Sequence, residues 1–213
     1  MPPRFNLTSP ALLAGLAAAF ILPGLAGHDL WKSQDAIALG VVHDMALRGD
    51  FIVPHVAGVV WLEDGPLYHW FAVAFGLVLR FAMPFHEAAR LASGAFVGAA
   101  LAFMYHAARE WTENEPERRT GAAAATLILL GSVGLMAHAH EAVPKLAALA
   151  ALCGAFAALP YAAARPARAG LAFGVGLGLA FLGGSWIAPL ALFVSAALAH
   201  AVCPAWRGRA AAR

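Results

Sequence analysis

The chain has 213 residues, of which 62% are hydrophobic and 12% charged, and its mean hydropathy is +0.72. Soluble domains are usually about half apolar and about a quarter charged, so this composition excludes a water-soluble enzyme and a disordered tail. The formal net charge of +2 gives no argument for a nucleic-acid partner. Cys153 and Cys203 lie in apolar stretches and indicate neither a disulfide framework nor a zinc site. The composition therefore predicts an all-α, polytopic membrane protein.

About 20 apolar residues cross a bilayer as a helix. Six stretches are expected to span: 10–27, 88–108, 120–137, 146–164, 169–186 and 187–202. With the N-terminus in the cytoplasm, the cytoplasmic segments hold nine of the fourteen Lys and Arg residues, and the opposite face holds eight of the twelve Asp and Glu residues. Basic residues favour the cytoplasmic side, so we expect a helical bundle with both termini cytoplasmic.

The longest connection, residues 28–87, lies between the first two predicted spans on the outer side. Long structured loops usually carry function. Residues 35–47 have one apolar stripe at helical spacing and predict an interfacial helix. Residues 67–83 predict a second helix, half-buried in the outer leaflet. If that helix spanned the bilayer, the sidedness of everything after it would be reversed.

A series of motifs runs through this loop into the second predicted span. In order they are Trp31-Lys-Ser-Gln-Asp35, His43-Asp-Met45, Gly49-Asp-Phe-Ile-Val-Pro-His55, Trp61-Leu-Glu63-Asp-Gly-Pro66-Leu-Tyr-His-Trp70 and Ala88-Ala-Arg-Leu-Ala-Ser93. The series resembles the N-terminal region of the GT-C-fold membrane glycosyltransferases. The pattern there is a D-E pair, G-D-W-x-V-P-H, E-K-P-P-L-Y-Y-W and A-R-L-x-S. The nearest branch contains the bacterial aminoarabinose transferases to lipid A and the dolichyl-phosphate-mannose protein mannosyltransferases.

The resemblance implies an enzyme of the bacterial inner membrane. Such an enzyme moves a sugar from a polyprenyl-phosphate carrier to a lipid, glycan or protein acceptor at the periplasmic face. Its expected partners are the lipid-linked sugar and membrane lipids, and a second membrane subunit or split-gene half is a further possibility. The alternative is a truncated or non-catalytic homologue that binds the carrier.

The resemblance also assigns site residues. Asp35, at the start of the first outer helix, is the expected catalytic carboxylate, and a simple helix cap is the alternative. Arg90 and His55 are expected to hold the carrier phosphate. The remaining candidate substrate-binding residues are Glu63, Asp64, Tyr68, His140, Glu141 and Lys145. No cofactor is expected, although His138-Ala-His-Glu141 could bind a divalent metal or be an ordinary polar loop.

The chain departs from the family pattern at several demanding positions. The D-E pair corresponds either to Gln34-Asp35 or to Asp35-Ala36. Asp64 and Gly65 replace a Lys and a Pro, and Lys145 replaces an Asp. Two hypotheses follow: Asp64 and Lys145 exchange the usual charges and still form an ion pair, or the site has decayed or handles a different substrate.

Overall fold

The computed structural model describes residues 8–30, 32–112, 117–184 and 186–203. Within these residues the chain is helical apart from one two-stranded antiparallel hairpin. The elements are α1 (Pro10–Ile21), α2 (Lys32–Arg48), β1 (His55–Val56), β2 (Val59–Val60), α3 (Leu67–Leu79), α4 (Phe85–Trp111), α5 (Arg118–Leu130), α6 (Val133–His138), α7 (Lys145–Ala158), a short 3-10 helix (Leu159–Tyr161), α8 (Pro166–Leu182) and α9 (Ile187–Val202).

Proline and glycine set several of these boundaries. Pro10 and Pro166 begin α1 and α8, where the missing backbone N–H would have no helical partner. Gly49 follows α2 with a φ of 72° and donates its N–H to the Met45 carbonyl, which closes the helix. Ala57 and Gly58 both have positive φ and form the tight turn that pairs β1 with β2.

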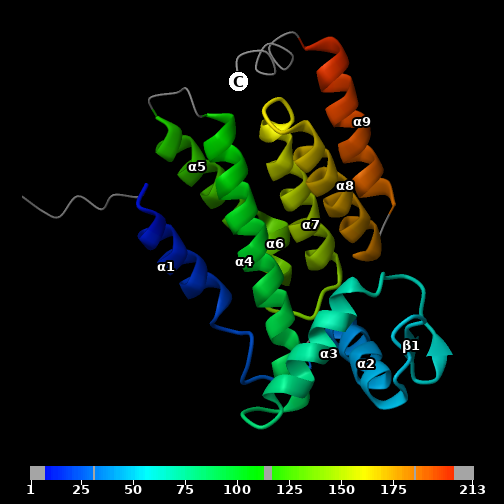
Figure 1. Cartoon of the computed structure of the whole chain (residues 1–213). Coiled ribbons are helices and arrows are strands. Elements are labelled where there is room, and N and C mark those ends of the chain that lie inside the picture. The colour runs from blue at the N-terminus through cyan, green and yellow to red at the C-terminus, as the bar shows by residue number, and fades with distance from the viewer. Residues whose placement is uncertain (1–7, 31, 113–116, 185, 204–213) are drawn as a thin grey trace, which may run out of the picture.

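Helix α4 is the centre of the fold (Figure 1). It contacts α1 and α5 along one side and α7 along another, while α8 and α9 follow on from α7. Helices α2 and α3 and the β-hairpin gather at the end of the bundle where α4 begins (Figure 1). The elements of the predicted outer loop therefore form one body at one end of the molecule.

Two apolar clusters hold this arrangement together. The first joins α2, α3, α4 and α7 and includes Val42, Met45, Ala72, Ala89 and Ala147. The second joins α1, α4, α6 and α7 and includes Ile21, Val97, Leu101, Leu135 and Leu146. Small residues allow the close helix contacts: a Cβ on Gly176 of α8 would stand 2.7 Å from Ala155 Cβ of α7.

The all-α prediction is confirmed apart from the small β-hairpin, while the six predicted spans are not confirmed. Helix α4 alone among the described helices has both the length and the hydropathy to cross a membrane by itself, with 27 residues and a mean hydropathy of 1.4. The apolar helices α1, α3, α8 and α9, and α7 with its 3-10 extension, are 10–17 residues long.

The prediction of one continuous helix over 120–137 is wrong. Helix α5 ends at Leu130, where the Gly131 N–H reaches back to Leu127 and Leu129. Ser132 is extended, with a ψ of 135°, and it separates α5 from α6. A Gly-Ser pair inside an apolar run is a recognised point of helix interruption.

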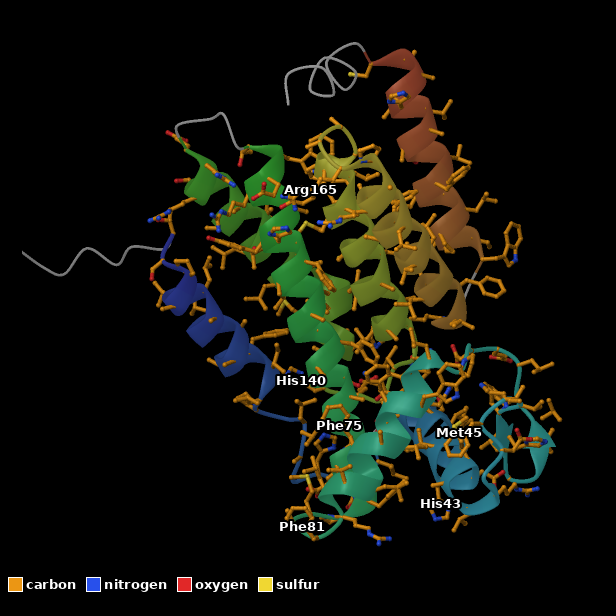
Figure 2. All side chains as sticks on the ribbon, viewed as in Figure 1. His43, Met45, Phe75, Phe81, His140 and Arg165 are labelled. Carbon is orange, nitrogen blue, oxygen red and sulfur yellow. The ribbon has the colours of Figure 1, made fainter. Side chains whose placement is uncertain are left out.

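Both helices predicted for the long loop are present, but the apolar stripe of α2 is packed inside the protein. Ala38, Val42 and Met45 pack inside the cluster shared with α3 and α4. Figure 2 shows Met45 and His43 on α2 and Phe81 beyond α3 at the opposite end of the molecule from Arg165. The predicted outer and cytoplasmic markers are thus separated along the bundle axis.

The turn before α3 contacts the turn between α8 and α9. A Cβ on Gly65 would collide with the carbonyl oxygen of Leu182, and one on Gly184 would be 3.8 Å from Asp64 Oδ1. The backbone of Gly65 thus lies directly against the backbone of Leu182 and Gly184. The Glu63–Pro66 turn is therefore fixed to the distal helices as well as to α3.

Candidate functional site

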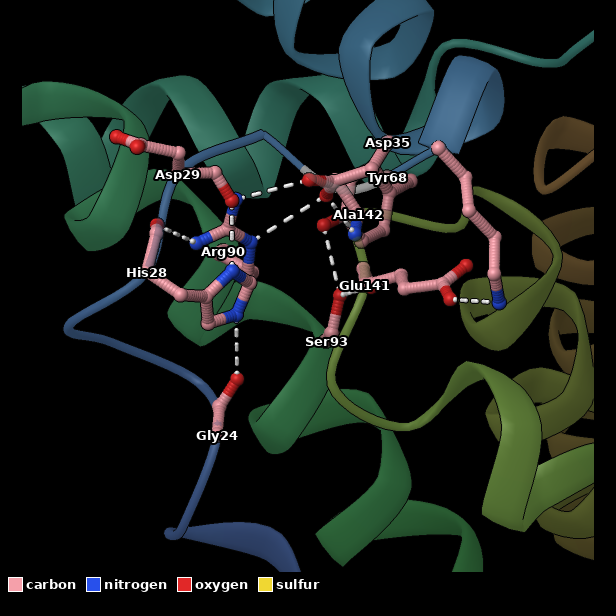
Figure 3. Close-up of polar contacts among 10 residues, drawn as sticks. Gly24, His28, Asp29, Asp35, Tyr68, Arg90, Ser93, Glu141 and Ala142 are labelled. Atoms are coloured by element: carbon pink, nitrogen blue, oxygen red, sulfur yellow. Dashed lines mark hydrogen bonds and ion pairs between the residues drawn. The ribbon is translucent and has the colours of Figure 1, made fainter.

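A buried ion pair lies where α2 meets α4. Asp35 and Arg90 are both fully buried, with Arg90 Nη2 2.8 Å from Asp35 Oδ2 and Arg90 Nε 3.3 Å from Asp35 Oδ1. The guanidinium therefore meets the carboxylate through two N–H groups, the geometry in which this pair is strongest. Figure 3 shows the pair with the segment that contains His28, whose carbonyl accepts from Arg90 Nη1 at 3.5 Å.

The loop between α6 and α7 completes this pair. The backbone N–H of Ala142 donates to Asp35 Oδ1 at 2.7 Å. Asp35 thus accepts hydrogen bonds from α4 and from the 139–144 loop, and it holds both against α2. Asp35 lies in the first turn of α2, as expected, but it has no solvent-exposed surface.

A second buried chain of hydrogen bonds runs beside the ion pair (Figure 3). Ser93 Oγ donates to the Glu141 carbonyl oxygen at 2.6 Å. The hydroxyl hydrogen of Ser93 is used there, so Tyr68 Oη is the donor in its 2.8 Å bond to Ser93 Oγ. Burial raises the pKa of Tyr68 and keeps the phenol protonated for this role. Helix α3 is thereby joined to the same loop.

At the rim of this cluster the charges become accessible. Lys32 Nζ, at the start of α2, lies 2.7 Å from Glu141 Oε1. His138 Nδ1, at the end of α6, lies 3.5 Å from Glu141 Oε2. The side chain of Glu141 is only 5% exposed, whereas those of Lys32 and His138 are 52% and 40% exposed. Lys32 was not among the sequence-predicted site residues, although it lies inside the first motif.

The structure therefore brings together four of the predicted residues, Asp35, Tyr68, Arg90 and Glu141. Others lie elsewhere. His55 is on β1, where its Nδ1 is 2.7 Å from the Val53 carbonyl. His140 Nε2 donates to the Phe20 carbonyl at 2.7 Å, so this ring faces the end of α1. Among the described residues no group of three His, Cys, Asp or Glu side chains could hold a metal ion, and the turn of His140 toward α1 accounts for this in the 138–141 loop.

Glu63, Asp64 and Lys145 are positioned around the turn that precedes α3 and the start of α7. Trp61 Nε1 donates to Asp64 Oδ2 at 3.5 Å, and Glu63 and Lys145 are exposed. Asp64 and Lys145, both within the described ranges, do not form the ion pair that the charge-exchange hypothesis requires. The roles of these residues in binding stay predictions.

His69 is a buried titratable group next to this turn. Its Nδ1 is 3.2 Å from the Gly65 carbonyl, and within the described part of the chain its Nε2 has no hydrogen-bond partner. Burial lowers the pKa of His69 to about 4, against the opposing effect of Asp64 and of the Gly65 bond. The ring is therefore neutral at physiological pH.

Comparison with known proteins identifies the fold. Neither family models nor curated proteins match the sequence. The chain shares its fold with part of a solved protein, which confirms the resemblance drawn from the motifs at the level of fold alone.

The solved structures concerned are those of ArnT from Cupriavidus metallidurans. The apo form matches with a TM-score of 0.72 at 19% identity, over 94% of this chain and 37% of that one. The form bound to undecaprenyl phosphate matches with a TM-score of 0.72 at 20% identity, over 92% of this chain and 37% of that one. The chain thus spans a little over a third of the length of these proteins.

The buried pair predicts a large stability cost for Asp35→Asn. The substitution leaves the Arg90 guanidinium buried without a counter-charge, and breaking such a pair costs about 3–5 kcal/mol. Asp44→Asn on the same helix is the control, because it removes a half-exposed pair with Arg48 worth at most about 1 kcal/mol. Unfolding of the purified protein in detergent measures both. Equal, small losses would show that the Asp35–Arg90 pair does not support the fold.

His69 predicts a pH dependence of stability. The unfolded ring takes up a proton near pH 6.5, while the folded ring resists it until about pH 4. Its contribution is therefore complete above pH 6.5 and is lost as the pH falls toward 4, by up to about 3 kcal/mol. His69→Leu should flatten the pH dependence of unfolding over this window. A variant with an unchanged pH profile would contradict the assignment.

Proposed function

We propose that this chain is the membrane part of a glycosyltransferase that uses a polyprenyl-phosphate-linked sugar at the outer face of a bacterial inner membrane. The observation that carries the proposal is the shared fold with ArnT over nearly the whole chain, in a protein whose structure has been solved with undecaprenyl phosphate bound. The ordered motifs of residues 31–93 support it from the sequence. They are the same segments that build the Asp35–Arg90 cluster.

The site supports the proposal through its charge and its position. A lipid-linked donor presents its phosphate at the headgroup level and its tail in the bilayer. The rim of the cluster offers the cation Lys32 and the ring of His138, and Lys145 is exposed nearby in the sequence, at the start of α7. The buried network behind them keeps α2, α4 and the 139–144 loop in fixed relative positions.

A carrier-binding protein without transfer activity is the second candidate. The observation in its favour is the state of Asp35, whose oxygens accept from Arg90 and from the Ala142 N–H. To take a proton from an acceptor hydroxyl, Asp35 would have to give up one of these bonds and become accessible. A catalytic role for Asp35 therefore remains a proposal that depends on such a rearrangement.

The proposal predicts that the protein binds undecaprenyl phosphate more tightly than undecaprenol, because only the phosphate can engage the rim cations. Native mass spectrometry of protein in nanodiscs compares the two lipids, which share the same tail. Transfer is then followed from a radiolabelled polyprenyl-phosphate sugar. Binding with transfer supports the enzyme, binding without transfer supports the second candidate, and equal binding of both lipids would refute both functions.

The proposed topology has six crossings with both termini in the cytoplasm, and it predicts opposite labelling of two exposed positions. A cysteine at Leu62 in the outer loop should react in intact cells with a membrane-impermeant thiol reagent. A cysteine at Arg119, at the start of α5, should react only after lysis. Both positions are exposed, so access is limited by the membrane alone. Cys153 and Cys203 are replaced beforehand. Reversed labelling would move the proposed site to the cytoplasm.

A further inference from the structure

The rim of the cluster contains one cation that can move and one carboxylate that cannot. Lys32 joins the cluster through a flexible side chain that is 52% exposed. Glu141 is fixed from both sides of its peptide: its carbonyl accepts from Ser93, and the following N–H, of Ala142, donates to Asp35. The backbone of Glu141 is therefore fixed on both sides of its carbonyl, whereas Lys32 reaches the carboxylate with a long side chain that is half exposed.

Arg90, the cation that the sequence assigns to the phosphate, is poorly suited to that role here. Its side chain has no exposed surface, and it already satisfies Asp35 through two N–H groups. An anion from outside could reach Arg90 only by breaking this pair and leaving Asp35 buried and uncompensated. Lys32 needs no such step, since half of its side chain already faces outward.

We propose that Lys32 is the phosphate-binding cation of this site and that Glu141 is its internal competitor. In the empty site Lys32 pairs with Glu141 at 2.7 Å. When a phosphate ester arrives, the ammonium group transfers from the carboxylate to the phosphate oxygens, and His138, whose Nδ1 is 3.5 Å from Glu141 Oε2 in the empty site, is left as the neighbour of the carboxylate. The ligand class is a phosphate ester. That the ester belongs to a polyprenyl carrier rests on the function proposed above.

This exchange predicts that removing one of the two charges strengthens phosphate binding. Glu141 lowers phosphate affinity in two ways, because it holds Lys32 and because it repels a second anion. Removing the Glu141 charge should therefore strengthen phosphate binding, while removing the Lys32 charge should weaken it. If the pair served the fold alone, both variants would leave binding unchanged.

The test compares binding of undecaprenyl phosphate, undecaprenol and inorganic phosphate to the full chain in nanodiscs. Lys32→Gln should weaken undecaprenyl phosphate binding about tenfold, the equivalent of about 1.4 kcal/mol, and Lys32→Arg should retain it. Glu141→Gln, which keeps the volume and both backbone bonds, should tighten binding severalfold. In the double variant the gain from Glu141→Gln should shrink, because the two residues are coupled.

Arg48→Gln is the matched control. Arg48 is 51% exposed and pairs with Asp44 at 3.0 Å, so it resembles Lys32 in exposure and pairing but lies at the other end of α2. It should not change phosphate binding. Thermal unfolding of every variant checks that the fold is retained.

Three results would overturn parts of the scheme separately. If undecaprenyl phosphate binds and neither Lys32→Gln nor Glu141→Gln alters its affinity, the exchange is wrong and the proposed function stands. If inorganic phosphate follows the predicted pattern while undecaprenyl phosphate binds no better than undecaprenol, the anion site stands and the carrier function fails. If neither phosphate binds, both proposals fail.

Discussion

The buried ion pair between Asp35 and Arg90 is the contact on which the packing of α2, α4 and the 139–144 loop depends. Two opposite charges without solvent are tolerated only when their geometry is good and their remaining hydrogen-bonding capacity is used. Both conditions are met through the two guanidinium N–H groups and the Ala142 N–H. Because each partner comes from a different element, satisfying the charges requires α2, α4 and the 139–144 loop to be in place together.

The Tyr68–Ser93–Glu141 chain extends this requirement to α3. A neutral phenol donates to a hydroxyl that donates to a backbone carbonyl, so the direction of every hydrogen bond is set. The interior of the site is thus a closed network, and the groups that can respond to a ligand lie at its edge. Arg90 is fully buried and supports the fold, whereas Lys32 is half exposed and is accessible to a ligand.

Sequence reasoning identified the residues of the network better than it identified their roles. Asp35, Tyr68 and Arg90 were found because they lie in ordered motifs, and α2 and α3 because of their apolar spacing. The pairing of Asp35 with Arg90 depends on how α2 docks against α4, and no local pattern encodes that. The burial of Asp35 and Arg90 was not predicted, for the same reason. The end of α5 at Leu130 did have a local signal in the Gly131-Ser132 pair. The prediction of one span over 120–137 followed hydropathy and did not use that signal.

The close approach of Gly65 to Leu182 gives a physical reason for one departure from the family pattern. The motif has proline at this place, and a pyrrolidine ring would occupy the space now filled by the end of α8. Gly65 and the Gly183-Gly184 turn therefore fit closely against each other. A proline at position 65 would fit only if the α8–α9 turn lay farther away. The glycine at this motif position is therefore explained by its packing against a segment distant in the sequence, and it is not by itself a sign that the site has decayed.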